Sequence, residues 1–239
     1  GSASHFAKGE YDWPVPHETR GDEVGVMARA LETLRDSIRF QMHEIADMAG
    51  ERQKLESELD IAREIQVAML PGAQVLEAGA AAVDVFAVLQ PAKAVGGDFY
   101  NFFEQDGGVL WFVIGDVSDK GVPAALFMVR TMTVLEVAAT LGGSPDRALA
   151  EAARHLVEGN DTCMFATALC GKLDLATGAL VLANAGHETP LRISADGHVA
   201  ALPVTAAAPL GFEVAEAYPC WHGLLAPGDT LLMYTDGVT

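Results

Sequence analysis

The sequence predicts an α+β fold, namely an antiparallel β-sandwich flanked by helices and preceded by a long coiled-coil helix. From Val24 to Met69, apolar residues recur at alternating steps of three and four, which is the heptad spacing of a supercoiled helix. After this segment, short apolar runs alternate with glycine-containing turns, and one helical block interrupts them. Antiparallel hairpins packed against helices give this pattern.

Composition narrows the class of protein. Half of the 239 residues are hydrophobic, which is enough for one domain-sized core. The formal net charge of −18 repels nucleic acid and anionic membrane surfaces, so we expect no nucleic-acid partner. No run of 18 apolar residues occurs, so we expect this chain not to insert into a membrane. The cysteines lack metal-ligand spacing, which favours free thiols and a cytoplasmic setting.

We distinguish three segments, of which the first, residues 1–22, is a connector. Residues 9–20 contain prolines and show no periodicity, which is typical of an extended chain. Asp22 and Glu23 then supply a cap and an acidic first turn for the helix that follows.

The second segment, residues 23–71, is predicted to be a helix that serves as a coiled-coil dimerisation linker. At ~1.5 Å per residue it would extend roughly 70 Å, too far to pack along a single domain. We therefore expect a homodimer through the coiled coil. Gln41, Arg52 and Gln66 interrupt the apolar seam. They are either exposed positions on a bent helix or polar seam positions that fix the register and let the coil switch.

The third segment, residues 72–239, carries the predicted sandwich. An Ala-rich loop opens it, and a Gly/Pro/Ala-rich loop precedes its last strand. Turn signals, apolar alternation and a Ser-Pro-Asp helix start divide the rest into elements. We expect helices at 124–140 and 144–158, and strands at 83–89, 99–104, 109–114, 164–175, 179–183, 190–193, 198–202 and 230–234.

Aspartates stand at the ends of several predicted strands. Asp98 lies in VGGDFY, Asp116 in WFVIGDVSDKG and Asp236 in MYTDGV. The turn at 106–108 makes a hairpin of the strands next to Asp98 and Asp116, which would bring these carboxylates to one edge. Each Asp could instead cap a helix or form an Asx turn. Carboxylates this close repel each other unless a cation neutralises them, and they suit Mg²⁺ and Mn²⁺.

The motifs VGGDFY, GDVSDKGVPAALFM, MFATAL, LANAGH and YTDGVT, in this order, resemble the bacterial PPM-type serine/threonine phosphatases of the SpoIIE and RsbU kind. The resemblance covers roughly residue 61 to the end. It implies a PPM phosphatase-like sandwich with two Mn²⁺ or Mg²⁺ ions held by Asp98, Asp116, the Val117 carbonyl and Asp236. The three acids would then be catalytic through metal-bound water.

The resemblance also implies a setting for the domain. Its substrate would be a phosphorylated STAS-domain protein, an anti-anti-sigma factor of a partner-switching pathway. The connector and the start of the helix resemble the end of a HAMP module, which relays signals from a membrane sensor. The native protein would be either cytoplasmic or anchored upstream in the inner membrane. Relatives continue beyond YTDGVT to a further metal-binding Asp, so we expect a phosphatase domain that is truncated at its C-terminus.

For several other polar residues near these motifs, the sequence allows two roles. His187 either braces a turn behind the site or acts as a general acid, and Asn184 bonds either a metal-bound water or its own turn. Lys120 and Arg130 are either phosphate contacts or solvated charges. Asp119 stands where relatives often carry glycine. The function expected is a metal-dependent protein serine/threonine phosphatase regulated through its coiled coil; the alternative is a non-catalytic dimeric signalling module.

Overall fold

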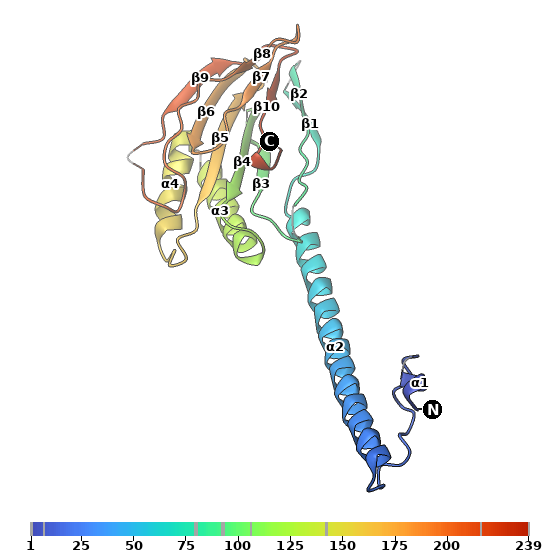
Figure 1. Ribbon diagram of the computed structural model, residues 1–239. Coiled ribbons are helices and arrows are strands. Elements are labelled where there is room, and N and C mark those ends of the chain that lie inside the picture. The colour runs from blue at the N-terminus through green and yellow to red at the C-terminus, as the bar shows by residue number, and fades with distance from the viewer. Residues whose placement is uncertain are drawn as a thin grey trace. The chain divides into compact units, whose positions relative to one another are not determined.

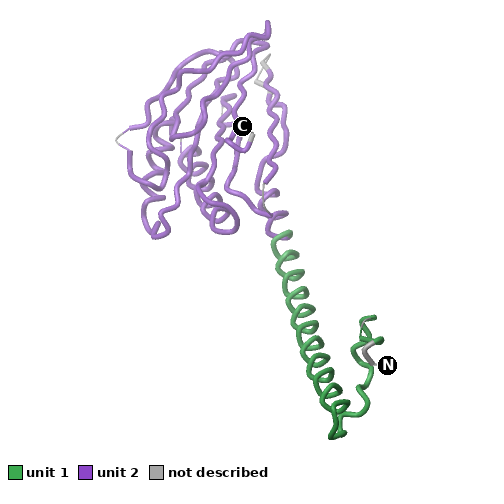
Figure 2. The backbone as a smooth tube through the Cα atoms, in the orientation of Figure 1, with its two compact units in different colours: residues 1–60 green, residues 61–239 purple. Residues whose placement is uncertain are grey.

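The computed structural model describes residues 2–6, 8–78, 81–91, 94–105, 107–141, 143–215 and 217–238 (Figure 1). The chain divides into two compact units, unit 1 with residues 1–60 and unit 2 with residues 61–239 (Figure 2). The boundary falls inside helix α2 (Glu23–Ala68), which is continuous over the predicted long helix. The predicted mixed fold of helices and antiparallel sheets with a long N-terminal helix is therefore confirmed.

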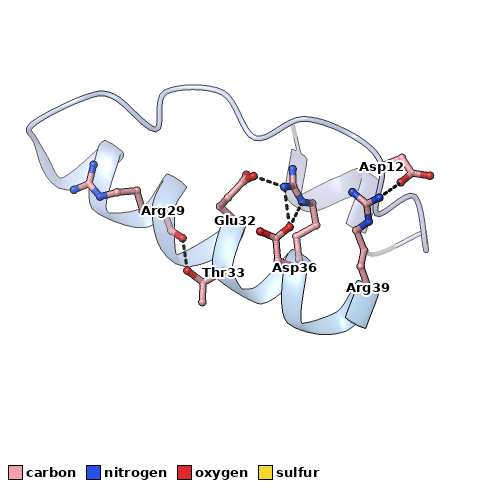
Figure 3. A network of polar contacts seen from close by, with 7 residues as sticks. Asp12, Arg29, Glu32, Thr33, Asp36 and Arg39 are labelled. Atoms are coloured by element: carbon pink, nitrogen blue, oxygen red, sulfur yellow. Dashed lines mark hydrogen bonds and ion pairs between the residues drawn. The ribbon is translucent and has the colours of Figure 1, made fainter. Parts of the chain in front are cut away.

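In unit 1 the connector packs on the first half of α2. The connector contains a short helix, α1 (Ser2–Phe6). The Arg29 guanidinium donates to the carbonyl oxygens of Glu18 at 2.8 Å and Arg20 at 3.0 Å. Arg39 pairs with Asp12 at 3.3 Å (Figure 3), so the helix contacts the connector both near its middle and near its end. Val15 of the connector is buried as well, so both polar and apolar contacts hold this segment.

Most apolar side chains of the predicted seam are exposed in the single chain. Ile45, for example, is 62% exposed, and Met27 and Leu55 are similarly open. Arg52 forms an i,i+4 pair with Glu56 at 2.8 Å, as expected on a solvated helix face. Gln66 differs from these residues because it is only 4% exposed. The interpretation of Gln66 as a position of the coiled-coil seam is therefore wrong: its side chain is buried within unit 2.

Unit 2 is built on a five-stranded antiparallel sheet with the order β3-β4-β5-β6-β9. Smaller sheets, β10-β7-β8 and β1-β2, accompany it. The strands of the large sheet are β3 (Phe99–Gln105), β4 (Val109–Val117), β5 (Ala166–Asp174), β6 (Ala179–Ala185) and β9 (Cys220–Leu224). The others are β1 (Gln74–Ala78), β2 (Ala81–Val85), β7 (Leu191–Ile193), β8 (Val199–Ala201) and β10 (Thr230–Leu232).

Two hydrophobic cores cover the two faces of the large sheet. On one face lie α3 (Val122–Thr140) and α4 (Pro145–Val157), whose buried residues pack with Trp111 and Val113 (Figure 1). On the other face Phe112 and Leu182 pack with residues of the smaller sheets. Along β4 and β6, alternate side chains point to opposite cores, as expected for a sheet that is covered on both faces. Among the described helices, α3 is long and apolar enough to span a membrane, yet it packs as a core helix.

Several strand boundaries differ from the sequence prediction. β1 lies in the expected Ala-rich loop, β9 lies in the expected Gly/Pro/Ala-rich loop, and β2 ends at Val85 rather than at residue 89. β9 pairs with β6 from Ala179↔Leu224 to Ala183↔Cys220. β1 and β2 pair with each other as a hairpin, from Gln74↔Val85 to Ala78↔Ala81, whereas the partner of β9 is distant along the chain. Asp106, part of the predicted hairpin turn, lies outside the described residues.

Candidate metal centre

Asp98 and Asp116 face each other across neighbouring strands. Phe99 pairs with Gly115 in the β3–β4 ladder, so the preceding residue, Asp98, comes opposite the following one, Asp116. The charge of Asp98 helps to raise the pKa of the Asp116 carboxyl, as expected for two acids that lie side by side. The proximity predicted from the hairpin is confirmed. Asp116 is the second-last residue of β4 rather than part of the turn, and it pairs with Thr167 of β5.

Asp236, near the end of the sequence, lies close to these two acids. It begins the 3-10 helix η1 (Asp236–Val238), and its charge raises the pKa of both Asp98 and Asp116. The neighbouring Thr235 lowers the pKa of Asp98, against the larger effect of burial, which raises it. A Cβ at Gly237 would lie 4.0 Å from Asp98 Oδ2, so the backbone here is close to that carboxylate. The structure thus brings together the three acids that the sequence singles out.

The electrostatics of the three acids are unfavourable without a cation. Burial raises the pKa of Asp116 from 3.8 to about 6, and the charges of Asp98 and Asp236 add to this. Burial also raises the pKa of Asp98. Asp98 Oδ1 is buried and has no hydrogen-bond partner among the described residues. A desolvated carboxylate oxygen of this kind, next to another acid, fits a hard divalent cation.

The Val117 carbonyl lies at the same edge. A Cβ at Gly97 would come within 2.8 Å of Val117 O, so only glycine fits at this approach. Carbonyl and carboxylate oxygens together form a donor set that suits Mg²⁺ or Mn²⁺. No three described His, Cys, Asp or Glu side chains form a group that could hold a metal ion. The core of the candidate site is therefore the Asp98–Asp116 pair, with Asp236 beside it.

A buried polar group supports the site from behind. Asn184 accepts the His187 N–H at 2.7 Å and donates to the His187 carbonyl at 3.0 Å. His187 Nδ1 lies 2.9 Å from Thr167 Oγ1, next to the Asp116 backbone in the β4–β5 ladder. Burial lowers the pKa of His187 to about 4, so its imidazole is neutral at pH 7. These contacts favour the bracing role of His187 over general-acid catalysis, and Asn184 bonds its own turn.

The two basic candidates, Arg130 and Lys120, differ in their surroundings. Arg130 donates to the carbonyl oxygens of His155 at 2.6 Å and Glu158 at 2.9 Å, at the end of α4. Its interpretation as a phosphate contact is therefore wrong, because the guanidinium caps a helix. Lys120 is exposed, and its charge lowers the pKa of Asp98 and Asp116, which places it near the acids. Asp119 has φ 72°, a left-handed conformation that Asp tolerates and glycine adopts freely.

Sequence reasoning missed two residues of this region. Thr167 links His187 to the edge of β4, and Gln66 bonds the backbone just before Asp98. Thr167 gave no signal, because a threonine in an apolar strand is ordinary. Gln66 gave one, since it is a polar residue in an apolar seam, but only the fold shows what it contacts.

Two curated proteins are similar to this chain in sequence. The chain is 28% identical over 200 residues to the phosphoserine phosphatase RsbU of Bacillus subtilis, covering 84% of this chain and 58% of RsbU. It is 27% identical over 257 residues to the protein IcfG of Synechocystis sp., covering 96% of this chain and 39% of IcfG. The chain therefore spans only part of the length of each relative.

A solved structure has the same architecture. The SiaA-PP2C domain of Pseudomonas aeruginosa matches with a TM-score of 0.62 and 25% identity, over 78% of this chain and 74% of that domain. Phosphatases of the PP2C type use divalent metal ions. The family described as Stage II sporulation protein E (SpoIIE) matches residues 106–239, more than half of the chain. This match, together with the fold, shows that the chain belongs to the SpoIIE family of PP2C-type phosphatase domains.

Proposed function

We propose that this chain is a metal-dependent protein serine/threonine phosphatase. The observation that carries the proposal is the Asp98–Asp116 pair: two half-buried acids with raised pKa values that lie opposite each other at the edge of adjacent strands. Such a pair destabilises the folded protein when no cation is bound, and it is typical of a functional site. Membership of the SpoIIE family and the name of the relative RsbU support the same activity.

The proposed site holds two Mn²⁺ or Mg²⁺ ions through Asp98, Asp116, the Val117 carbonyl and Asp236. Bound there, such ions supply a nucleophilic water at neutral pH and positive charge for the phosphate. The protein's own groups provide the anionic donors and keep them together through the β3–β4 ladder. Lys120, exposed beside the acids, is suited to attract the phosphate dianion of a protein substrate.

The resemblance to this family also supports a proposal for the substrate and the regulation. We propose that the substrate is a phosphorylated STAS-domain protein of a partner-switching pathway, acted on in the cytoplasm. The exposed apolar seam of α2 supports a homodimer through the coiled coil. Apolar side chains at heptad spacing are unfavourable in water, and a second helix that covers them would stabilise the helix. The HAMP-like connector, fastened along α2, fits a role in passing a signal to this helix.

A non-catalytic signalling module is the second candidate. One observation favours it: no group of three described His, Cys, Asp or Glu side chains is arranged to hold a metal ion. Such a module would keep the fold and the coil and would bind its partner without hydrolysing phosphate.

Mn²⁺-stimulated hydrolysis of p-nitrophenyl phosphate and of a phosphoserine peptide separates the two functions. We expect Asp116→Asn to lower the Mn²⁺-dependent rate on the order of 100-fold or more, because metal chemistry contributes several kcal/mol to such reactions. Asp196→Asn, at an exposed turn between β7 and β8, is the matched control and should leave the rate unchanged. A parent chain without Mn²⁺-stimulated hydrolysis would favour the binding module.

A further inference from the structure

Gln66 makes a two-point contact with the backbone of unit 2. It lies near the end of α2, where its neighbours Ile65 and Val67 are exposed while Gln66 itself is 4% exposed. Gln66 Nε2 donates to the Gly96 carbonyl at 2.7 Å, and the Gly96 N–H donates to Gln66 Oε1 at 3.2 Å. The side-chain amide therefore pairs with Gly96 as a neighbouring strand would. Both groups of Gly96 that would otherwise need water or a strand partner are satisfied by this one side chain.

Gly96 belongs to a tightly packed turn that leads into the candidate metal centre. Gly97 follows it, and a Cβ at Gly97 would lie 2.8 Å from Val117 O and 3.0 Å from Val117 Cβ. A Cβ at Gly96 would meet Pro91 Cβ at 3.5 Å. The turn is thus enclosed by Val117 on one side and by Gln66 on another. Asp98 is the next residue, so a shift of Gly96 moves its backbone.

The same turn adjoins two of the proposed metal-binding groups at once. Asp98 continues the chain from Gly97, and the Val117 carbonyl faces Gly97 directly. Because the interior is close-packed, a displaced Gly96–Gly97 peptide cannot be absorbed without moving one of these oxygen donors. Metal affinity depends on such supporting contacts, which orient the ligands without touching the ion.

We propose that Gln66 is a positioning residue: its amide ties the last turn of α2 to the Gly96–Gly97 turn and thereby sets the placement of Asp98 and the Val117 carbonyl for metal binding. The inference rests on the proposed function and adds a route of regulation to it. A movement of the last turn of α2 that breaks the Gln66–Gly96 pair would weaken metal binding, although no residue of α2 touches the ion. Linkage requires the converse, namely that bound metal makes the Gly96 amide harder to expose.

The central test is Gln66→Met, which keeps the length of the side chain and removes both hydrogen bonds. Calorimetric titration with Mn²⁺ should show affinity weakened about tenfold or more, the usual effect of losing a contact that orients a ligand. Gln53→Met, on the exposed part of α2, is the matched control and should bind Mn²⁺ like the parent. Turnover of a phosphopeptide should recover at high Mn²⁺ with KM for the peptide unchanged.

Two further variants guard against a merely structural effect. Gln66→Glu keeps the acceptor for the Gly96 N–H, so we expect an affinity between those of the parent and Gln66→Met, and this variant serves if Gln66→Met fails to fold. Gly97→Ala leaves Gln66 intact and presses a Cβ on Val117 O, and it should also weaken Mn²⁺ binding. Hydrogen exchange at the Gly96 amide should be slowed by Mn²⁺ in the parent but not in Gln66→Met.

The outcomes separate the inference from the proposed function. A parent chain that binds Mn²⁺ while Gln66→Met, folded but less heat-stable, binds it equally tightly would overturn the positioning role alone. A parent chain that binds no Mn²⁺ would overturn the proposed function and this inference with it. Weakened binding in Gln66→Met with normal binding in Gln53→Met would establish the link between the end of α2 and the metal centre.

Discussion

At the scale of single residues, Asp116 shows a conflict between stability and function. Its pKa is raised from 3.8 to about 6, first by burial and then by the charges of Asp98 and Asp236. A folded protein with such an acid binds more protons than its unfolded chain, so ionising the acid disfavours folding. The contribution of Asp116 to the stability of the metal-free protein is therefore largest below pH 4 and is lost as the pH rises through about 6. A bound cation would remove this penalty.

We therefore expect Asp116→Asn to stabilise the metal-free protein at pH 7 even though it abolishes the proposed activity. The amide cannot ionise, so the repulsion from Asp98 and Asp236 is relieved. The melting temperature in EDTA should rise by about 2–4 °C, which corresponds to ~1 kcal/mol for a chain of this size after solvent screening is allowed for.

The pH dependence of melting checks this expectation. Thermal unfolding of the parent and of Asp116→Asn should differ at pH 7 and coincide near pH 4, where the parent carboxyl is protonated. A variant that melts lower than the parent at pH 7 in EDTA would show that the Asp116 carboxylate stabilises the fold, contrary to its raised pKa.

At the scale of elements, the β3–β4–β5 ladder positions the site, and Gly115 makes its close packing feasible. Gly115 pairs with Phe99 on one side and Ala168 on the other. A Cβ here would approach Phe99 Cζ and the Thr167 carbonyl oxygen, both at 2.4 Å. The Phe99 ring therefore lies over Gly115, directly next to the two acids. The glycine is needed for this contact and not for a turn, since it lies within a regular strand.

Gly115→Ala should accordingly destabilise unit 2 by about 1–3 kcal/mol, the typical effect of overpacking a core. It should also weaken Mn²⁺ binding, because the Phe99 side of the ladder must move away from Asp116. Gly50→Ala is a control of opposite sign: nothing lies within 4 Å of its added Cβ, and alanine favours the helix by roughly 0.5–1 kcal/mol. Urea unfolding of both variants measures the two effects, and equal stability of Gly115→Ala and the parent would contradict the close contact between the Phe99 ring and Gly115.

At the scale of the whole molecule, α2 links regulation to catalysis in the proposed function. The seam of α2 is apolar and exposed in unit 1. Gln66 continues the same spacing but is buried in unit 2, where it contacts Gly96. The polar seam positions that remain are Gln41 and Arg52, both exposed. A coil with such positions is weaker than one with a fully apolar seam, which suits a helix that must change its arrangement.

Replacing Gln41 and Arg52 by leucine should strengthen the homodimer and hold phosphatase activity at one level. Ile45→Asp should do the reverse and give a monomer, because it puts a charge in the seam without touching unit 2. Sedimentation gives the oligomeric state and phosphopeptide release gives the rate. A parent chain that is monomeric at micromolar concentration, or an Ile45→Asp monomer with unchanged turnover, would contradict the switch while leaving the metal site intact.

The sequence predicts correctly what depends on local pattern. The heptad spacing indicates the long helix, and the turn between the strands next to Asp98 and Asp116 indicates a hairpin, because both signals lie within a few residues of the structure that they specify. The family resemblance adds Asp236, which no local pattern connects to the other acids. The roles of these residues in binding metal stay predictions.

What the sequence alone leaves open depends on partners that are distant along the chain. β9 is a strand because β6 offers it an edge, and Arg130 caps α4 because the α3–α4 packing brings it to that helix end. Gln66 has the spacing of a coiled-coil seam but is buried against Gly96, thirty residues further along. Heptad spacing predicts a helix face that is to be covered and not what covers it, so the same pattern holds exposed side chains in one part of α2 and the buried Gln66 in another.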